Sequence, residues 1–302
     1  MDRPFQNTSA YWARFSEYEY RQGDDGHTYL MPTAQSKPAV YDPMKEADTL
    51  VVDALNVGRL AMKRDADEEK LKQAILDFVT KYGLLGFMPA LPTTPEFMNY
   101  GAVYLPKNHF IKEEAMAAQE YLALFFPFRK PDVYKDGSKA QWDVNDRTDD
   151  RTMVALAMTF SNDPMTVGMS LQRIYAERYD WLVTQFRDWA FMLVSTFLFY
   201  EDKDDTDELT RDLYRQGVSA FGGKAPTFHV SLYEDKPRIV WDFYSLLMTI
   251  QTMFGFALTD ESKPLLLCKH CNLAFISGQQ SDVFCSEKCK GQFKIYKGRG
   301  KK

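Results

Sequence analysis

Cysteine is absent from the first 262 residues of this 302-residue chain, and histidine is scarce throughout. The chain has four cysteines and four histidines in all. Three of the histidines, His27, His109 and His229, have no recognisable partner in the sequence, and an isolated histidine is more often structural or exposed than catalytic. The sequence therefore indicates neither a histidine-based metal site nor a cysteine nucleophile in this part of the chain.

Motifs of common catalytic sites are also missing. The chain contains no G-x-G-x-x-G or P-loop motif for phosphate binding, and no G-x-S-x-G or H-E-x-x-H motif. Acidic pairs such as Asp149-Asp150 and Asp204-Asp205 are typical of solvated loops. We therefore predict that the chain is not an enzyme, although a catalytic site without a sequence motif stays open.

No apolar run is long enough to cross a bilayer. The longest extends over twelve residues, from Trp189 to Tyr200, and is interrupted by Ser195 and Thr196, whereas a span needs about twenty. The first residues, Met1-Asp2-Arg3-Pro4, lack the apolar core of a signal peptide. These absences predict no membrane association and a cytoplasmic location, where thiols stay reduced.

The four cysteines that are present all lie in residues 263–302, at Cys268, Cys271, Cys285 and Cys289. The pattern is C-x2-C, a gap of thirteen residues, then C-x3-C. Two thiolate pairs at this spacing are what a tetrahedral zinc site requires. We predict a structural Zn²⁺ ion closed by four sulfur ligands, because a segment this short cannot stabilise itself by its own core. The alternatives are two disulfides, four free thiols, or His270 in place of one cysteine ligand.

The sequence around these cysteines predicts an order of elements. Lys269 and His270 lie between the first two cysteines, as in a zinc knuckle. Apolar residues at 273–276 and 283–284 flank a turn and predict a short hairpin. Cys285 and Cys289 are four residues apart, which places them on one face of a helix that continues to Lys297. Knuckle, hairpin and helix make a treble clef, and a zinc ribbon with a second knuckle is the alternative.

The C-x2-C-x3-F opening at Cys268 and the closing sequence Phe284-Cys285-Ser286 before Cys289 resemble small treble-clef fingers of bacterial proteins. The chain is similar in this respect to the CGNR-type zinc-finger proteins, in which a larger helical domain precedes a C-terminal finger. Where that family has Cys-Gly-Asn-Arg, this chain has Cys289-Lys290-Gly291-Gln292, so the signature arginine is missing. The resemblance covers about an eighth of the chain and implies a transcription regulator.

Charge is distributed unevenly along the chain. Residues 263–302 hold nine Lys/Arg and two Asp/Glu, a net charge of +7, whereas the rest holds 28 and 40, a net charge of −12. A basic module on an acidic body indicates an anion-binding site. We predict that the last helix binds DNA or RNA phosphates, with a glutamine at a base edge. The predicted contact residues are Lys288, Lys290, Gln292, Lys294, Lys297 and Arg299.

Other functions of the finger and of the preceding body stay open. As a protein-interaction module, the finger would dock on a partner protein or on a second copy of the chain. As a ligand-sensing regulator, the body would enclose a small-molecule pocket. The simplest interpretation of the positive charge is a solvated basic tail.

Apolar residues at helical spacing dominate the body. They predict helices near residues 43–63, 67–82, 112–125, 164–200, 208–216 and 242–258. Hairpins are predicted around Asp25-Gly26 and at residues 228–241, and a surface loop at residues 129–150. We therefore predict a mainly α fold with small β-hairpins, in which a large helical domain at 1–262 precedes a treble-clef-like zinc finger at 263–302. The connection at 259–264 is short, so the finger should pack against the body.

Overall fold

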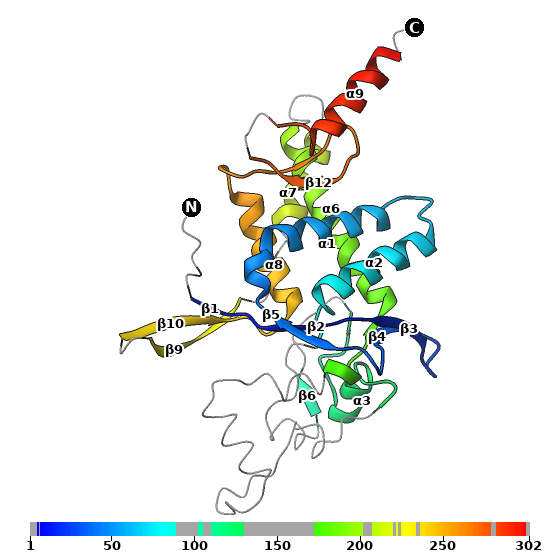
Figure 1. The fold of residues 1–302 in the computed structure, drawn as a ribbon, viewed down its shortest axis with the longest axis vertical. Coiled ribbons are helices and arrows are strands. Elements are labelled where there is room, and N and C mark those ends of the chain that lie inside the picture. The colour runs from blue at the N-terminus through cyan, green and yellow to red at the C-terminus, as the bar shows by residue number, and fades with distance from the viewer. Residues whose placement is uncertain are drawn as a thin grey trace, which may run out of the picture. The chain divides into compact units, whose positions relative to one another are not determined.

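The chain forms two compact units in the computed structural model (Figure 1), which describes residues 5, 7–88, 102–104, 110–129, 172–201, 207–219, 222, 225–233, 236–278 and 282–299. Unit 1 comprises residues 1–10, 42–78 and 183–302, and unit 2 comprises residues 11–41 and 79–182. Each unit is therefore assembled from segments that lie far apart in the sequence. The domain boundary predicted between residues 262 and 263 stays a prediction.

Unit 1 contains helix α1, Ala47–Ala61, which follows a 3-10 turn, η1, at Pro43–Glu46. Asp42 begins this segment as the sequence predicts, because its carboxylate accepts a hydrogen bond from the Met44 N–H at 3.0 Å. Pro43 is suited to the first turn, since its fixed φ matches the helix and it has no N–H to satisfy. A local cap and an apolar stripe together explain why this helix was predictable.

A glycine permits close helix packing in unit 1. Gly58 of α1 faces Phe186 of helix α6, Tyr179–Glu201, and a Cβ at Gly58 would lie 1.9 Å from the Phe186 carbonyl oxygen. Only glycine allows two helix backbones to approach this closely.

Helix α8, Leu246–Thr259, is capped by Ser245, whose hydroxyl accepts a hydrogen bond from the Met248 N–H. Other helices that lie wholly or partly in unit 1 are α2, Glu68–Tyr82, and α7, Glu208–Ser219.

Unit 1 also contains a three-stranded sheet of order β1-β10-β9. Strands β9, Thr227–Tyr233, and β10, Lys236–Asp242, form the hairpin predicted at 228–241 and pair antiparallel over seven residues each. Strand β1, Thr8–Ser9, adds a short parallel pair to the end of β10. The ring of Phe5 packs edge-on against Trp241, with 5.2 Å between the ring centroids, and so covers the base of the hairpin.

The described part of unit 2 consists largely of short antiparallel strands. Strands β3, Tyr18–Gln22, and β4, Thr28–Pro32, form the hairpin predicted around Asp25-Gly26, and β8, Glu177–Arg178, pairs with the other edge of β4. Gly26 has a φ of 79°, which the turn requires and glycine supplies without strain. Separate pairs join β2, Trp12–Phe15, to β5, Pro38–Tyr41, and β6, Ala102–Tyr104, to β7, Ala115–Ala117.

The predicted mainly α fold is wrong, because the chain is a mixed α/β protein. Of the residues that the structure describes, 47% are helical and 21% lie in strands, and about 20–25% strand is ordinary for a mixed domain. The strands are short, and several of their partners are remote in sequence: Thr8 pairs with Trp241 and Leu30 with Glu177. A strand of two residues has no alternating pattern to read, so sequence periodicity could not reveal it.

Several predicted helices agree with the structure and others need correction. The helices at 67–82 and 208–216 are confirmed as α2 and α7, and the helix predicted at 43–63 is α1, preceded at Pro43–Glu46 by the 3-10 turn η1. The helix predicted at 112–125 is shorter, with only α3, Ala118–Ala123, because Ala115–Ala117 pair with β6 instead. The helix predicted at 242–258 begins later, at Leu246, because β10 extends to Asp242.

The helix predicted at 164–200 is confirmed from Tyr179 on, but it is wrong at residues 175–178, where Glu177–Arg178 form β8 beside β4. Residues 164–171 lie outside the described part of the chain, as does nearly all of the loop predicted at 129–150. In the described part, no helix has both the length and the apolar character of a bilayer span.

Candidate metal centre

The first cysteine pair lies in a tight turn between two paired strands. Strands β11, Leu265–Leu267, and β12, Ala274–Ile276, are antiparallel, and Cys268 and Cys271 lie on the connection between them. The Cys268 N–H donates to the Leu273 carbonyl oxygen at 2.9 Å, and the Asn272 N–H donates to the Cys268 carbonyl oxygen at 2.8 Å. Asn272 has a φ of 61°, in the left-handed region that asparagine tolerates. This is the knuckle that the sequence predicted.

The hairpin predicted to follow the knuckle is formed differently. Residues 274–276 pair with residues 265–267, before the knuckle, and not with residues 283–284. Val283 instead accepts a hydrogen bond from the Lys269 N–H of the knuckle, at 3.0 Å. Both candidate partner segments are short and apolar, so the alternating pattern alone did not distinguish them.

The second cysteine pair lies at the start of helix α9, Glu287–Arg299. The Ser286 hydroxyl accepts a hydrogen bond from the Cys289 N–H at 3.2 Å, and the Ser286 carbonyl oxygen accepts one from the Lys290 N–H at 3.1 Å. Ser286 therefore caps the helix, with Cys285 immediately before the cap and Cys289 in the first turn. The predicted helix is confirmed from Glu287 on, but Cys285 lies before it, so only Cys289 of this pair is on the helix; the second knuckle of a zinc ribbon is not present.

The four sulfur atoms lie together, all within 4.8 Å of one another. The Cys271 and Cys285 sulfurs are 3.7 Å apart, and those of Cys285 and Cys289 are 3.5 Å apart. A disulfide has an S–S distance of about 2.05 Å, so the disulfide alternative is wrong and the cysteines are free. Tetrahedral zinc with Zn–S bonds of about 2.3 Å separates its sulfurs by about 3.8 Å. The cluster therefore has the size that this ion needs.

The cluster also has the electrostatics of a cation site. Burial disfavours a charged Cys268, but main-chain N–H groups of Cys271, Cys285 and His270 donate to its sulfur and lower the pKa of Cys268 to about 6. Desolvation and three neighbouring sulfurs raise the pKa of Cys285 to about 12. One thiolate is thus stabilised by the protein itself, whereas several at once require a neutralising cation.

A side chain of α1 anchors this segment to the rest of unit 1. The Asn56 amide donates to the Ala274 carbonyl oxygen at 3.2 Å, and its oxygen accepts from the Ala274 N–H at 2.7 Å. Arg59 of the same helix donates from Nε to the Asn272 carbonyl oxygen at 3.3 Å. The Asn56 side-chain amide thus makes with Ala274 the pair of hydrogen bonds that a residue of a neighbouring strand would make with its main chain. Nothing in the sequence distinguished this asparagine from other polar helix residues, but the predicted packing of the finger against the body is confirmed.

The predicted nucleic-acid contacts lie along α9 and differ in their surroundings. Lys288, Lys294 and Lys297 are exposed. Lys290 forms an ion pair with Glu287 at 3.1 Å. Gln292 is hydrogen-bonded to His270, with 3.0 Å between Oε1 and Nε2. Arg299 is the last residue of the helix.

Aromatic side chains attach α9 to the cysteine-bearing loops. The rings of His270 and Tyr296 stack with 5.7 Å between their centroids, which explains why His270 is not part of the sulfur cluster. Phe293 packs on Phe284 at 5.2 Å. The helix is therefore held to both cysteine pairs, while its lysines point to solvent.

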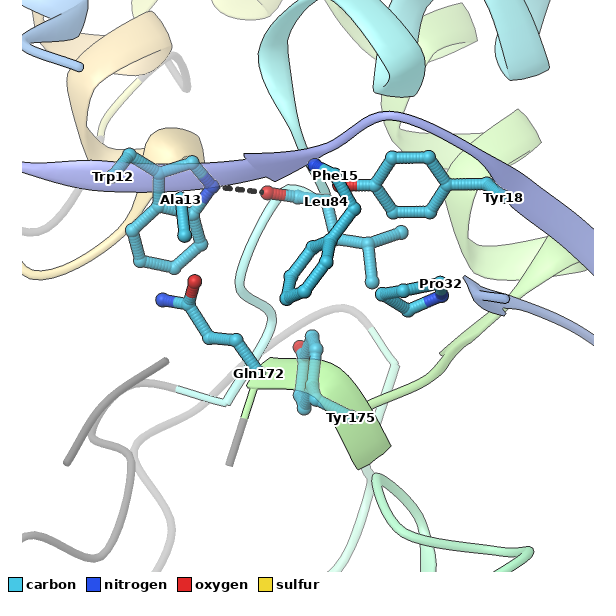
Figure 2. Close-up of a pocket in the computed structure, with 8 residues that line it drawn as sticks. All are labelled: Trp12, Ala13, Phe15, Tyr18, Pro32, Leu84, Gln172 and Tyr175. Atoms are coloured by element: carbon cyan, nitrogen blue, oxygen red, sulfur yellow. Dashed lines mark hydrogen bonds between the residues drawn. The ribbon is translucent and has the colours of Figure 1, made fainter. Parts of the chain in front are cut away.

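Unit 2 offers no comparable site among its described residues. Figure 2 shows a small pocket whose lining includes Trp12, Gln172 and Tyr175. The space open to water is about 10 Å³, room for about one water molecule. The indole N–H of Trp12 donates to the Leu84 carbonyl oxygen at 2.8 Å and belongs to the core. This pocket is too small for the ligand that a ligand-sensing body would bind.

A buried carboxylate in unit 2 has a structural role. Glu177 accepts hydrogen bonds from the N–H groups of Leu85, Gly86 and Phe87 and from the Tyr175 hydroxyl. Burial raises the pKa of Glu177 to about 7, although these donors offset part of the rise. Its oxygens are occupied by the loop that they organise, so it is not placed to act on a substrate.

Comparisons with known proteins return no matching family, no matching curated protein and no matching solved structure. The resemblance to CGNR-type fingers therefore stays a prediction, and any function of this chain must be argued from its own residues.

Proposed function

We propose that residues 263–302 form a zinc finger in which Cys268, Cys271, Cys285 and Cys289 hold a structural Zn²⁺ ion and helix α9 binds nucleic acid. The observation that carries the proposal is the sulfur cluster at the base of a basic, exposed helix. Four thiolates leave no open coordination position, so the ion stabilises the fold and does not activate a substrate.

The choice of zinc follows from the donor set. Soft thiolate ligands in a tetrahedral arrangement favour zinc or iron over magnesium and calcium, which prefer oxygen. Elemental analysis of the purified full-length chain should return about one zinc per chain. One iron per chain with no zinc, or no metal in a fully ordered protein, would contradict the proposed ion.

Nucleic-acid binding is supported by charge that the fold leaves available. Residues 263–302 carry a net charge of +7, and Lys288, Lys294 and Lys297 extend into solvent from one rigid element. Lysine contacts to phosphate are independent of sequence and weaken with salt. Gln292 already bonds His270, so a base-edge contact would require that bond to be exchanged. We therefore expect binding dominated by the phosphate backbone.

Binding is tested with labelled duplex DNA, single-stranded DNA and RNA at several salt concentrations. Replacing Lys288, Lys294 and Lys297 by Gln should weaken binding and reduce the salt dependence of log K for duplex DNA by about 2 to 3, since each phosphate contact contributes about 0.9. The matched control replaces three exposed lysines elsewhere in unit 1, Lys45, Lys63 and Lys236.

The control triple variant has the same net charge, so it separates a located site from general attraction. Equal losses in both triple variants would mean that binding is non-specific. Negligible binding of the wild type at low salt would eliminate this function.

Protein docking by the finger is the second candidate, because α9 exposes apolar surface beside its lysines. Ile295 is 55% exposed and Tyr296 is 63% exposed. Solvent-facing apolar residues on a basic helix would suit an acidic partner protein. If substitution of these two residues by Ser abolished capture of a partner while nucleic-acid affinity was unchanged, docking would be the main function of α9.

A further inference from the structure

The β9–β10 hairpin has one face that is entirely apolar and largely uncovered. Phe228, Val230 and Leu232 of β9 lie on this face, opposite Trp241, Ile239 and Pro237 of β10. We call these six residues the apolar face. The exposed fractions are 59% for Phe228, 63% for Val230, 73% for Leu232 and 50% for Ile239. Apolar surface gathered in this way is a mark of an interaction site.

The opposite face of the same hairpin is polar and internally paired. His229 Nδ1 lies 2.9 Å from Asp242 Oδ2, and the Arg238 guanidinium lies over the Tyr233 ring at 4.9 Å. The hairpin is therefore an ordered element whose two faces differ sharply. Such a division is expected when one face of a sheet meets water and the other meets protein.

The outer edge of β9 also has free main-chain groups. Among the described strands, β9 has a partner on one side only, β10. The Trp241 N–H donates to the Asn7 carbonyl oxygen at 2.9 Å, and the Ile239 carbonyl oxygen accepts from the Asn7 amide at 3.4 Å. These groups of β10 point away from β9, so the residues opposite them, Phe228 and Val230, point their own N–H and C=O away from β10.

Leu232 and Pro237 form a third pair whose main-chain groups point away from each other. Leu232 faces Pro237, which has no N–H to offer, as expected at a pair without hydrogen bonds. The free edge of β9 thus presents the N–H and C=O of Phe228, Val230 and Leu232. These are the residues whose side chains form the apolar face.

The edge carries none of the features by which proteins block strand pairing. Exposed edge strands are normally protected by lysine, proline or a bulge. Strand β9 reads Thr-Phe-His-Val-Ser-Leu-Tyr, with no lysine and no proline, and its register with β10 runs without a bulge. An unprotected edge of seven residues beside an apolar face is suited to receive another strand.

We propose that β9 pairs antiparallel with β9 of a second copy of the chain, with Val230 opposite its own counterpart on the two-fold axis. In this register Phe228 faces Leu232 of the other copy, and the free N–H and C=O groups of all three residues find partners. The two apolar faces then lie on the same side of one six-stranded sheet. If the two-fold axis passed between two residues of β9 and not through one, each apolar residue would face a polar residue of the other copy, so such a register is disfavoured.

The size of the contact predicts a weak dimer. In this pairing β9 separates Ile239 from the other copy, so the side chains that meet are those of Phe228, Val230 and Leu232, and the outward surface of the apolar face stays open. The buried area is therefore well below the roughly 800 Å² per partner of a standard specific interface. Dimerisation should be weak, should depend on protein concentration and should not require the metal or nucleic acid.

Sedimentation velocity of the zinc-loaded full-length chain over a range of concentrations tests the proposal. The wild type should shift from monomer to dimer, and Val230→Lys should weaken the dimer at least about tenfold, because two lysines would meet on the axis. Ser231→Lys is the matched control, since Ser231 lies on the polar face one residue away, and it should leave the dimer intact.

A second variant tests the strand pairing itself. Val230→Pro removes the outward N–H while sparing the bonds to β10, so it should abolish the dimer and leave the hairpin folded. Hydrogen exchange should show amide protection at Phe228, Val230 and Leu232 that rises with protein concentration. A chain that stays monomeric, a dimer that Val230→Lys and Ser231→Lys affect equally, or a dimer without that protection would overturn the proposal.

Discussion

The contact between Asn56 and β12 predicts that one amide on α1 controls the local stability of the metal centre. Replacing Asn56 by Ala removes a donor 3.2 Å from the Ala274 carbonyl oxygen and an acceptor 2.7 Å from the Ala274 N–H. Ala274 is only 3% exposed, so water cannot readily replace either bond. The substitution leaves the four sulfurs of the proposed zinc site unchanged, so it acts on how firmly residues 265–276 are held to α1.

The expected magnitude follows from those two bonds. Each contributes about 0.5–1.5 kcal/mol net, and an unsatisfied buried group costs about 1–3 kcal/mol. Alanine has a higher helix propensity than asparagine, and this offsets up to about 0.7 kcal/mol of the lost stability. We therefore expect the local free energy of opening to fall by about 2 kcal/mol, which corresponds to roughly 30-fold faster amide exchange.

Hydrogen exchange measured by mass spectrometry on residues 265–276 is the appropriate assay, with zinc bound throughout. Asn56→Asp is a second variant: it keeps an acceptor for the Ala274 N–H but turns a carboxylate oxygen toward the Ala274 carbonyl oxygen, so its effect should be at least as large as that of Asn56→Ala. Exchange in Asn56→Ala that equals the wild type would refute the reasoning and would mean that the metal alone positions β12.

Two further predictions concern the metal and the buried carboxylate. Cys289→Ser should reduce the zinc content to well below one ion per chain and unfold α9, as measured by elemental analysis and circular dichroism. The control Ser286→Ala should retain zinc and lower the free energy of unfolding by only about 1 kcal/mol, through the lost helix cap. Full zinc occupancy in Cys289→Ser would contradict the four-sulfur site. The pKa of Glu177 is raised from 4.5 to about 7, so the folded state keeps a proton that the unfolded state has released. The free energy of unfolding, measured with urea, should therefore fall as pH rises between about 4.5 and 7, by up to about 3 kcal/mol more in the wild type than in Glu177→Gln. If the two proteins showed the same pH dependence, Glu177 would not be the group that titrates.

Some elements could be predicted because their signals are local. Asp42 and Pro43 mark the start of the η1–α1 segment, and a long apolar stripe identifies α2. The hairpins at Asp25-Gly26 and 228–241 have turn residues between alternating segments. In each case the residues that determine the structure lie within about one element of each other, where propensity and periodicity are informative.

Other elements were missed because their partners are remote. Strand β8 has two residues and exists only because β4 lies beside it. Strand β12 pairs with β11 and not with residues 283–284. Asn56 of α1 already bonds the main chain of Ala274, and Lys269 of the knuckle already bonds the main chain of Val283, and neither contact is visible in the sequence. The predicted helix at 112–125 gave way to β7 for the same reason, since pairing with β6 outweighed local helix propensity.

The cysteine cluster could be read from the sequence alone, because the spacing of the cysteines is fixed along the chain: two pairs at C-x2-C and C-x3-C allow four sulfurs to meet. The sequence also determined that positive charge would concentrate beside that site. Folding was needed to show that Asn56 holds the finger on α1 and that His270 and Gln292 are hydrogen-bonded to each other. The structure also shows that one face and one edge of β9 stay uncovered, because contacts between residues more than 200 positions apart depend on packing that no local pattern encodes.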